Sequence, residues 1–298
     1  MVAQIIDGKK IAAEIKDGLR TDIEELSRKG CTPGLTVVLV GENPASQIYV
    51  RMKTRASESL GINSETIQLP ADTSQQKLLS IVGELNESDD VHGILVQLPL
   101  PEQIDERLVI YSIDPSKDVD GFHPVNRGKL LLGEDTFIPC TPFGIQEILL
   151  RSDFSPEGKH VVIVGRSKIV GLPLATMLMQ KNARANATVT VCHSGTHDLG
   201  RFTNAADILV AAMGRPQFIK GNLIKKGAVV IDVGVNRVED ANSEKGYRLL
   251  GDVEFETVAE RAKAITPVPG GVGPMTIAML MVNTVKAAKK FCASSSTG

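Results

Sequence analysis

The stretch that decides the fold is His160-Val161-Val162-Ile163-Val164-Gly165-Arg166-Ser167-Lys168-Ile169-Val170-Gly171. Four consecutive β-branched apolar residues lead into a glycine turn, and an apolar helical pattern begins at Leu172. A strand, a tight turn and a helix in this order leave backbone N–H groups free at the helix N-terminus, where they can bind a pyrophosphate. The segment therefore predicts one βα unit of a dinucleotide-binding domain.

The glycine pattern of this turn departs from the usual dinucleotide fingerprint. A G-x-G-x-x-G motif starting at Gly165 would need glycines at 167 and 170, where the chain has Ser167 and Val170. Alone, the segment fits an ordinary βα turn equally well. Two more glycine turns, at 212–216 and 232–236, also follow apolar runs, and loops at the carboxyl ends of parallel strands are where a nucleotide lies. We therefore predict a nucleotide site formed by Gly165, Arg166, Ser167, Ser194, Gly214, Pro216 and Val235.

The residues that follow the next predicted strand favour NADP as the cofactor. NAD sites usually place Asp or Glu there to bind the ribose 2′-hydroxyl, whereas this chain has Cys192-His193-Ser194. A carboxylate would repel a 2′-phosphate, but Ser194 and the guanidinium of Arg166 could bind one. His193 and His197 are four residues apart, but they straddle a strand end and a glycine, so no metal site is predicted.

Strand-like and helical patterns alternate along the whole chain. Short, mostly β-branched runs occur at 35–40, 94–98, 161–164, 188–192, 208–211 and 229–233. Helical patterns lie between them at 11–29, 46–60, 75–85, 172–180 and 274–290. This alternation predicts an α/β protein with parallel sheets. A break near Pro139 and Pro142 predicts two domains, 1–142 and 143–273, with the final helix, 274–292, packing back on the first.

Composition excludes several classes of function. The net charge is -2 without a long basic run, and aromatic residues make up 4% with no Trp, so neither nucleic-acid nor membrane-surface binding is predicted. Signal-peptide and transit-peptide features are lacking, and no apolar stretch approaches the ~18 residues of a membrane span, so we expect a cytoplasmic protein. The four cysteines form no Cys-x-x-Cys pair and are expected to be unreactive thiols in a reducing compartment.

The first half of the chain carries the residues suited to chemistry. Residues 41–46 end a strand and offer Ser46 as a helix N-cap. Tyr49 and Lys53 then lie four residues apart on one helix face, where a partly desolvated Lys could handle protons. The pair is equally compatible with a solvated surface. Short-chain dehydrogenases also use Tyr-x-x-x-Lys, but there it follows the nucleotide segment, whereas here it precedes it.

Three further segments add polar or constrained groups. Gln97 stands at a strand end before a Pro-bounded loop and could bind a lysine ammonium or a substrate amide. Asp118 and Asp120 lie close to a Gly turn at Gly121, and either could be only a solvated loop acid. The loop 266–276 is rich in Pro and Gly, which make it stiff and allow close backbone approach, so we interpret it as a wall of a binding site.

Taken in order, these stretches resemble the bifunctional methylenetetrahydrofolate dehydrogenase/cyclohydrolase family over residues 5–291. The matching segments are Val40-Gly41 with Pro44-Ala45-Ser46 and Tyr49-Val50-x-x-Lys53, then 93–101, 117–122, 139–142, 164–171 and 266–278. Each is weakly specific alone, but six in the same order are specific.

The resemblance implies an α/β fold of two domains, an N-terminal catalytic domain and a Rossmann-like NADP domain with a cleft between them, in a homodimer joined through the NADP domains. It implies oxidation of 5,10-methylenetetrahydrofolate with NADP, followed by hydrolysis of the methenyl product to 10-formyltetrahydrofolate in the same site. It also implies site roles for Lys53 as the catalytic lysine, Tyr49 against the folate, Gln97 bonded to the lysine, Asp120 on the pterin, Arg166 and Ser194 on the NADP phosphate, and Pro269, Gly270 and Gly273 in the wall shared by both ligands.

Three alternatives remain open from the sequence. A monofunctional NAD-dependent methylenetetrahydrofolate dehydrogenase would share the fold, although Arg166 and Ser194 favour NADP. An amino-acid dehydrogenase would leave the loops at 118–120 and 266–276 unexplained. A nucleotide sensor without catalysis would not need Tyr49, Lys53, Gln97 and Asp120 together.

Overall fold

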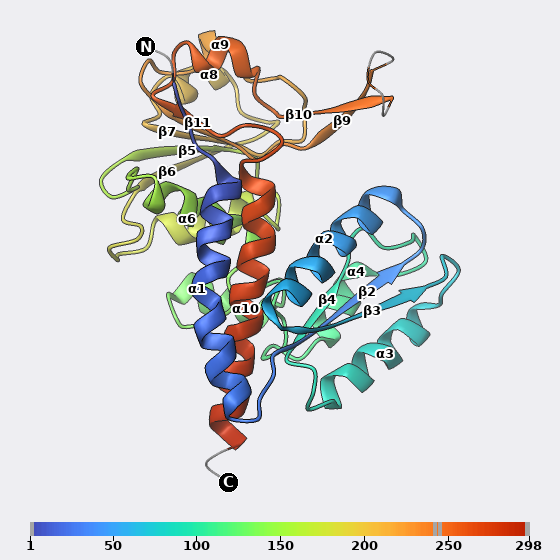
Figure 1. The fold of residues 1–298 in the computed structure, drawn as a ribbon. Helices are drawn as coiled ribbons and strands as arrows, with labels where there is room; N and C mark the ends of the chain where they lie inside the picture. The colour runs from blue at the N-terminus through green and yellow to red at the C-terminus, as the bar shows by residue number, and fades with distance from the viewer. Residues whose placement is uncertain (1–2, 241–242, 244–245, 296–298) are drawn as a thin grey trace. The chain divides into compact units, whose positions relative to one another are not determined.

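The computed structural model describes residues 3–240, 243 and 246–295 (Figure 1). The chain divides into two compact units. The first unit comprises Ala13–Cys140 and Ile277–Gly298, and the second comprises Met1–Ala12 and Thr141–Thr276. The predicted α/β class with parallel sheets is confirmed.

The first unit is built on a three-stranded parallel sheet in the order β3-β2-β4, with β2 at Gly34–Val40, β3 at Asn63–Leu69 and β4 at Gly93–Val96. β2 and β4 are buried along their whole length, whereas the edge strand β3 alternates between exposed and partly buried residues. This is why apolar runs predict β2 and β4 but miss β3. The helices associated with this unit are α1 (Gly8–Arg28), α2 (Pro44–Leu60), α3 (Gln75–Glu87), α4 (Glu106–Ser112), α5 (Pro124–Leu132) and α10 (Val272–Ser295).

The second unit contains a six-stranded parallel sheet in the order β1-β11-β8-β7-β5-β6. Its strands are β1 (Gln4–Ile5), β5 (His160–Val164), β6 (Thr188–Cys192), β7 (Ile208–Ala211), β8 (Val229–Asp232) and β11 (Ala264–Ile265). An antiparallel hairpin of β9 (Asn236–Glu239) and β10 (Tyr247–Leu250) follows β8. The helical elements of this unit are short; they are α6 (Cys140–Arg151), α7 (Gly171–Leu178), α8 (Leu199–Thr203), η1 (Gly221–Leu223) and α9 (Phe255–Ala259).

The first residues of the chain belong to this second sheet. β1 pairs in parallel with β11, so residues up to Ala12 group with the second unit and not, as predicted, with residues 13–142. Two residues of edge strand carry too little pattern for the sequence to reveal their partner.

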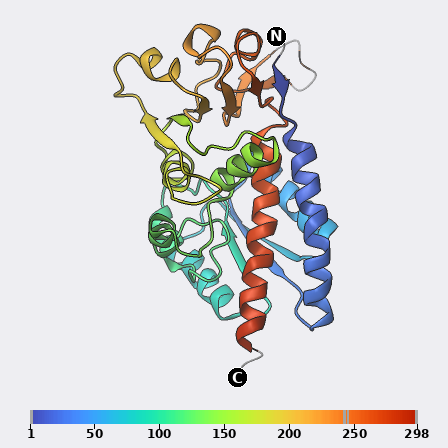
Figure 2. The same ribbon diagram turned by 90° about the vertical axis from the view of Figure 1, so that its left-hand side faces the viewer.

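The final helix packs on the first unit from Ile277 onward, where it lies beside α1 (Figures 1 and 2). Lys289 at its end forms an ion pair with Asp22 of α1 at 2.7 Å. Cys292 is disulfide-bonded to Cys31, the residue that leads toward β2. The prediction that all cysteines are free thiols is therefore wrong for this pair, because chain spacing does not show that a C-terminal helix returns to residue 31.

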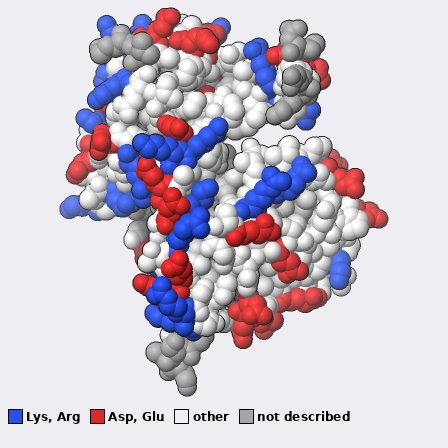
Figure 3. Space-filling model, viewed as in Figure 1, with Lys and Arg blue, Asp and Glu red and all other residues white. Residues whose placement is uncertain are grey.

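The surface shows no tract of one charge on the face drawn in Figure 3, where basic and acidic side chains are intermixed. Within the described residues, no helix combines the length and the apolarity needed to cross a membrane.

Candidate active site

The helix that carries the candidate lysine begins at a well-defined cap. Gly41 turns the chain after β2 with a φ of 83°, and the Asn43 side-chain oxygen accepts hydrogen bonds from the Ala45 and Ser46 N–H groups at 3.0 and 3.1 Å. Pro44 occupies the first helical turn, where a missing N–H costs nothing. The predicted N-cap Ser46 is wrong, since Ser46 is buried inside the helix and Asn43 has that role.

Lys53 lies on the buried face of α2 and is only 9% exposed. Its Nζ donates a hydrogen bond to Gln97 Oε1 at 2.9 Å. Gln97 follows β4, and its Nε2 donates to the Leu98 carbonyl at 2.7 Å, which turns the amide oxygen toward the lysine. The structure thus brings together two residues predicted from separate segments.

Three titratable groups share this environment. Burial lowers the pKa of Lys53, and the negative charge of Asp120 partly opposes that shift. Burial raises the pKa of Asp120, with Lys53 opposing. Burial and the nearby Asp120 also raise the pKa of the Cys140 thiol. Lys53 therefore releases its proton more readily than an exposed lysine does, as a proton-transfer group must near neutral pH. Cys140 is a neighbour to which sequence reasoning gave no role, although its Pro-Cys-Thr-Pro segment stood out.

The two loop carboxylates, Asp118 and Asp120, have different surroundings and therefore different roles. Asp118 is buried and accepts hydrogen bonds from Phe122 N at 3.1 Å, His123 N at 2.8 Å and Asn126 Nδ2 at 2.8 Å. The Asp118 carboxylate therefore stabilises the conformation of this loop. Asp120 interacts with Lys53 and Cys140 instead, so it is the carboxylate available to a ligand.

Tyr49 lies one turn before Lys53 on α2 and is 38% exposed. Burial of the rest of its side chain raises the pKa of the hydroxyl, which keeps it protonated. An aromatic ring that is partly exposed beside a buried lysine is suited to stack on a flat heterocycle.

In the second unit, the turns after β5 and β7 meet where the strand order reverses, since β5 lies between β6 and β7. Gly165 has a φ of 135°, and a Cβ there would stand 2.1 Å from the Ala212 carbonyl oxygen. Such a switch point is where open parallel sheets bind nucleotides. A Cβ on Gly171 would lie 2.0 Å from the Gly165 oxygen, so this second glycine permits close packing of α7.

Ser167 occupies the position at which the usual fingerprint has its second glycine. Its Oγ accepts hydrogen bonds from Val170 N at 3.1 Å and Gly171 N at 3.4 Å, so the side chain closes the turn itself.

The remaining predicted nucleotide residues lie at the same carboxyl edge of the sheet. Arg166 and Ser194 are exposed and follow the adjacent strands β5 and β6. Gly214, Pro216 and Val235 are exposed on the turns after β7 and β8. Sequence reasoning missed Asp252, which is fully buried and accepts hydrogen bonds from the Met213, Gly214 and Arg215 N–H groups.

The Pro/Gly-rich loop is packed tightly against the start of α1. A Cβ on Gly8 would lie 1.8 Å from the Gly271 oxygen, and Gly270 is buried with a φ of 111°. Pro269 is exposed and Gly273 is partly buried, so both present surface at this loop. The loop is thus a constrained element of the second unit.

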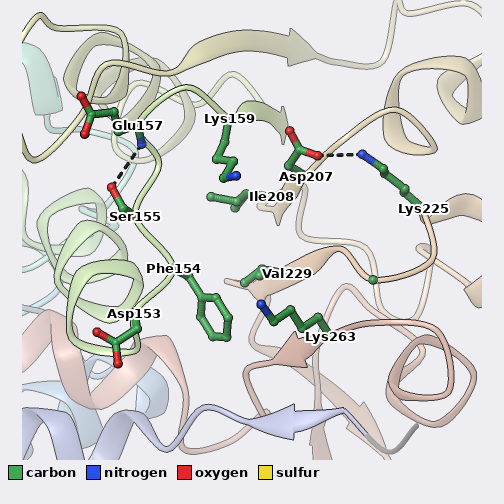
Figure 4. A pocket seen from close by; sticks show the side chains of 11 residues that line it. Asp153, Phe154, Ser155, Glu157, Lys159, Asp207, Ile208, Lys225, Val229 and Lys263 are labelled. Atoms are coloured by element: carbon green, nitrogen blue, oxygen red, sulfur yellow. Dashed lines mark hydrogen bonds and ion pairs between the residues drawn. The ribbon is translucent and has the colours of Figure 1, made fainter.

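A cavity of about 440 Å³ lies elsewhere on the second unit (Figure 4). Lys159, Lys225 and Lys263 line it, and Lys225 is paired with Asp207 at 2.7 Å. Lys159, Asp207, Lys225 and Lys263 precede β5, β7, β8 and β11, respectively, on the edge opposite the glycine turns. The cavity is therefore separate from the candidate nucleotide site.

Comparison with known proteins agrees with this geometry. Residues 6–120 match the model of the tetrahydrofolate dehydrogenase/cyclohydrolase catalytic domain, and residues 139–292 match the NAD(P)-binding domain of the same family. The chain belongs to the tetrahydrofolate dehydrogenase/cyclohydrolase family. The predicted family is confirmed, and with it a bifunctional enzyme that acts on tetrahydrofolate derivatives and contains an NAD(P)-binding domain.

Relatives in this family match over nearly their full length. The bifunctional protein FolD of Prosthecochloris aestuarii is 57% identical over 285 residues, covering 95% of this chain and 97% of that protein. The crystal structure of the bifunctional enzyme FolD from Campylobacter jejuni has a TM-score of 0.91 at 48% identity and covers 97% of this chain and 99% of its own. The Trypanosoma brucei enzyme, solved with NADP and an inhibitor, has a TM-score of 0.92 at 42% identity, covering 97% and 98%.

Proposed function

We propose that this enzyme oxidises 5,10-methylenetetrahydrofolate with NADP and hydrolyses the 5,10-methenyltetrahydrofolate product to 10-formyltetrahydrofolate, with Lys53 as the proton-transfer group. The observation that carries the proposal is the buried Lys53 ammonium, hydrogen-bonded to Gln97 at 2.9 Å and influenced by the charge of Asp120. A lysine in this setting is matched to chemistry that must take up and release protons.

Hydrolysis needs this lysine because water must lose a proton as it adds to the methenyl carbon. The C–N bond that then breaks needs a proton on its nitrogen, so one group serves first as base and then as acid. Overall, the methenyl cation and water give 10-formyltetrahydrofolate and one proton. Gln97 Oε1 accepts a hydrogen bond from Lys53 and orients it, while Asp120 is placed to bind N–H donors of the pterin.

Oxidation makes different demands on the protein. A bound nicotinamide supplies the hydride acceptor, and the chain's residues hold the two reactants in position. In this proposal Tyr49 stacks on the folate. Loss of Lys53 should therefore harm hydrolysis much more than ligand binding.

The residues present fit NADP better than NAD. No carboxylate stands directly after β6, which ends at Cys192 and is followed by His193 and Ser194. Arg166 and Ser194 are exposed at the ends of neighbouring strands, so a guanidinium and a hydroxyl are available to a 2′-phosphate. Gly165, Ser167, Gly214, Pro216 and Val235 complete the proposed nucleotide site.

The test is a spectrophotometric assay with methylenetetrahydrofolate and either NADP or NAD, following both the reduced cofactor and the methenyl absorbance. We expect oxidation to be at least about tenfold more efficient with NADP and to be followed by decay of the methenyl signal. In Arg166→Leu, KM should rise about tenfold for NADP and stay nearly unchanged for NAD. Equal efficiency with both nucleotides, or a methenyl product that accumulates without hydrolysis, would contradict the proposal.

We also propose a homodimer joined through the NAD(P)-binding units, working in the cytoplasm. The family resemblance supports the dimer. Sedimentation equilibrium of the purified chain tests the first, since a monomer at micromolar concentration would refute it.

A further inference from the structure

The turn after β7 is held by one carboxylate that is itself fully buried, that of Asp252. Asp252 Oδ2 accepts hydrogen bonds from Met213 N at 2.7 Å and Gly214 N at 2.9 Å, and Oδ1 accepts from Arg215 N at 2.8 Å. These are three consecutive amides of the turn. Asn236 Nδ2 donates a fourth bond to Oδ1 at 2.9 Å.

A second carboxylate links this arrangement to the neighbouring strand. Asp232, the last residue of β8, accepts hydrogen bonds from Gly234 N at 3.0 Å, Asp252 N at 2.9 Å and Val253 N at 3.0 Å. The turns after β7 and β8 are thus connected through the segment that carries Asp252. Both turns expose residues of the proposed nucleotide site.

The backbone approaches both carboxylates so closely that only glycine fits at positions 234 and 251. A Cβ on Gly234 would lie 2.3 Å from Asp252 Oδ1, and a Cβ on Gly251 would lie 1.8 Å from Asp232 Oδ2. Asp252 is fully buried, so its bonds to the amides act in a dry environment where charge-assisted hydrogen bonds are strong.

The four donors around Asp252 match the acceptor capacity of a carboxylate. Two carboxylate oxygens offer about four lone-pair sites, whereas an amide side chain of the same shape replaces one oxygen by a donor. Each oxygen of Asp252 accepts from two donors, so Asp252→Asn would direct an NH₂ group at two N–H donors whichever oxygen it replaces, and the turn would have to shift.

We propose that Asp252 is a positioning residue for the dinucleotide, which fixes the turn at Met213, Gly214 and Arg215 and, through Asp232, keeps it in register with the turn after β8. This inference rests on the proposed function, because that function places the nucleotide on these turns. Asp252 acts through the backbone and touches no reacting atom.

The two activities of the enzyme separate this role from a general contribution to folding. Oxidation needs the nucleotide, whereas hydrolysis of added methenyltetrahydrofolate needs Lys53 in the other unit and no nucleotide. A positioning residue for the dinucleotide must therefore alter the first reaction through KM for NADP and spare the second.

The experiment compares wild type with Asp252→Asn, Asn236→Ala and the control Asp207→Asn. Asp207 is another hydrogen-bonded carboxylate of the same sheet, which accepts from His160 N at 3.0 Å and Lys225 Nζ at 2.7 Å at the opposite edge. We expect Asp252→Asn to raise KM for NADP at least about tenfold, with kcat and methenyl hydrolysis changed less than about threefold. Asn236→Ala removes one of the four hydrogen bonds to Asp252, together with the Asn236 bond to the Leu250 carbonyl, and should raise KM about threefold. Asp207→Asn should leave KM unchanged.

An unchanged KM for NADP in folded Asp252→Asn would overturn the inference, as would a parallel loss of both activities. If Asp252→Asn does not fold, Asn236→Ala decides in the same way, because an unchanged KM in that variant contradicts the role. Failure of the proposed function is distinguishable, since wild type itself would then show no NADP-dependent oxidation.

Discussion

Lys53 and Gln97 show how burial and an uncharged hydrogen-bond partner together set the chemistry of a side chain. The lysine would be an ordinary cation in water, but burial lowers its pKa and the amide oxygen of Gln97 supplies one acceptor at 2.9 Å. The uncharged amide binds the ammonium without adding a second negative charge beside Asp120. The site therefore keeps the lysine able to change its protonation state during hydrolysis.

This balance predicts the effect of adding a charge. In Gln97→Glu, a carboxylate next to Lys53 favours the ammonium and raises the lysine pKa. The base form then appears only at higher pH, so the rise of hydrolysis rate with pH should move upward by about one unit or more. The pH profile of methenyltetrahydrofolate hydrolysis measures this, with Gln97→Met as an uncharged control. A profile that does not move, or moves to lower pH, would contradict the role of Lys53 as a titrating base.

At the scale of the element, the N-terminus of α2 is capped by Asn43, which the sequence analysis did not identify as the cap. Asn43 satisfies two N–H groups at the start of the helix that carries Tyr49 and Lys53. The pattern Asn-Pro-Ala-Ser contains two residues that can cap, and apolar periodicity does not choose between them. Pro44 decides in favour of Asn43, since proline is suited to the first helical position.

Removal of the cap should destabilise the fold by a predictable amount. Asn43→Ala is expected to lower the free energy of unfolding by about 1 kcal/mol, while Asn43→Asp keeps the acceptor and stays close to wild type. Urea denaturation followed by circular dichroism measures both. Ser46→Ala, by contrast, should lack the cap effect, so a loss of capping in that variant but not in Asn43→Ala would show the assignment to be wrong.

Strands could be predicted from the sequence where nearly all of their residues are buried and therefore apolar. In β5, β7 and β8 every residue except His160 is buried, and the three strands consist mainly of continuous apolar residues. The sequence predicts each of them. The edge strand β3 and the hairpin strands β9 and β10 mix polar and apolar residues, because one face or both faces meet solvent. Their pattern is indistinguishable from that of a loop.

At the scale of the molecule, the disulfide ties together distant parts of the first unit. Cys31 and Cys292 are 261 residues apart in the chain, so the bond strongly restricts the unfolded state. Reduction should lower the melting temperature of wild type by about 5 °C or more. The double variant Cys31→Ser/Cys292→Ser should melt at the temperature of the reduced protein with or without reductant. An equal effect of reductant on both proteins would mean that the bond is not responsible.

Much of the candidate site could be predicted because its residues come from stretches with distinct local character. The sequence indicates Lys53, Gln97 and Asp120 individually, each from its own segment, although it does not show that they lie close together. Cys140 and Asp252 were not, since a buried thiol beside a carboxylate and a carboxylate that holds another turn are tertiary facts without a local signal. The sequence alone does not show which segments, far apart in the chain, lie next to each other in the fold.

The central claim is that Lys53 carries the proton chemistry of hydrolysis, and Lys53→Met tests it most directly. Hydrolysis of methenyltetrahydrofolate is followed by loss of its absorbance, and folate affinity is measured on the same protein, with the exposed Lys29→Met as the matched control. We predict that Lys53→Met loses hydrolysis at least about a hundredfold while its folate Kd changes less than about tenfold, and that Lys29→Met behaves as wild type. Hydrolysis by Lys53→Met at the wild-type rate would contradict the account.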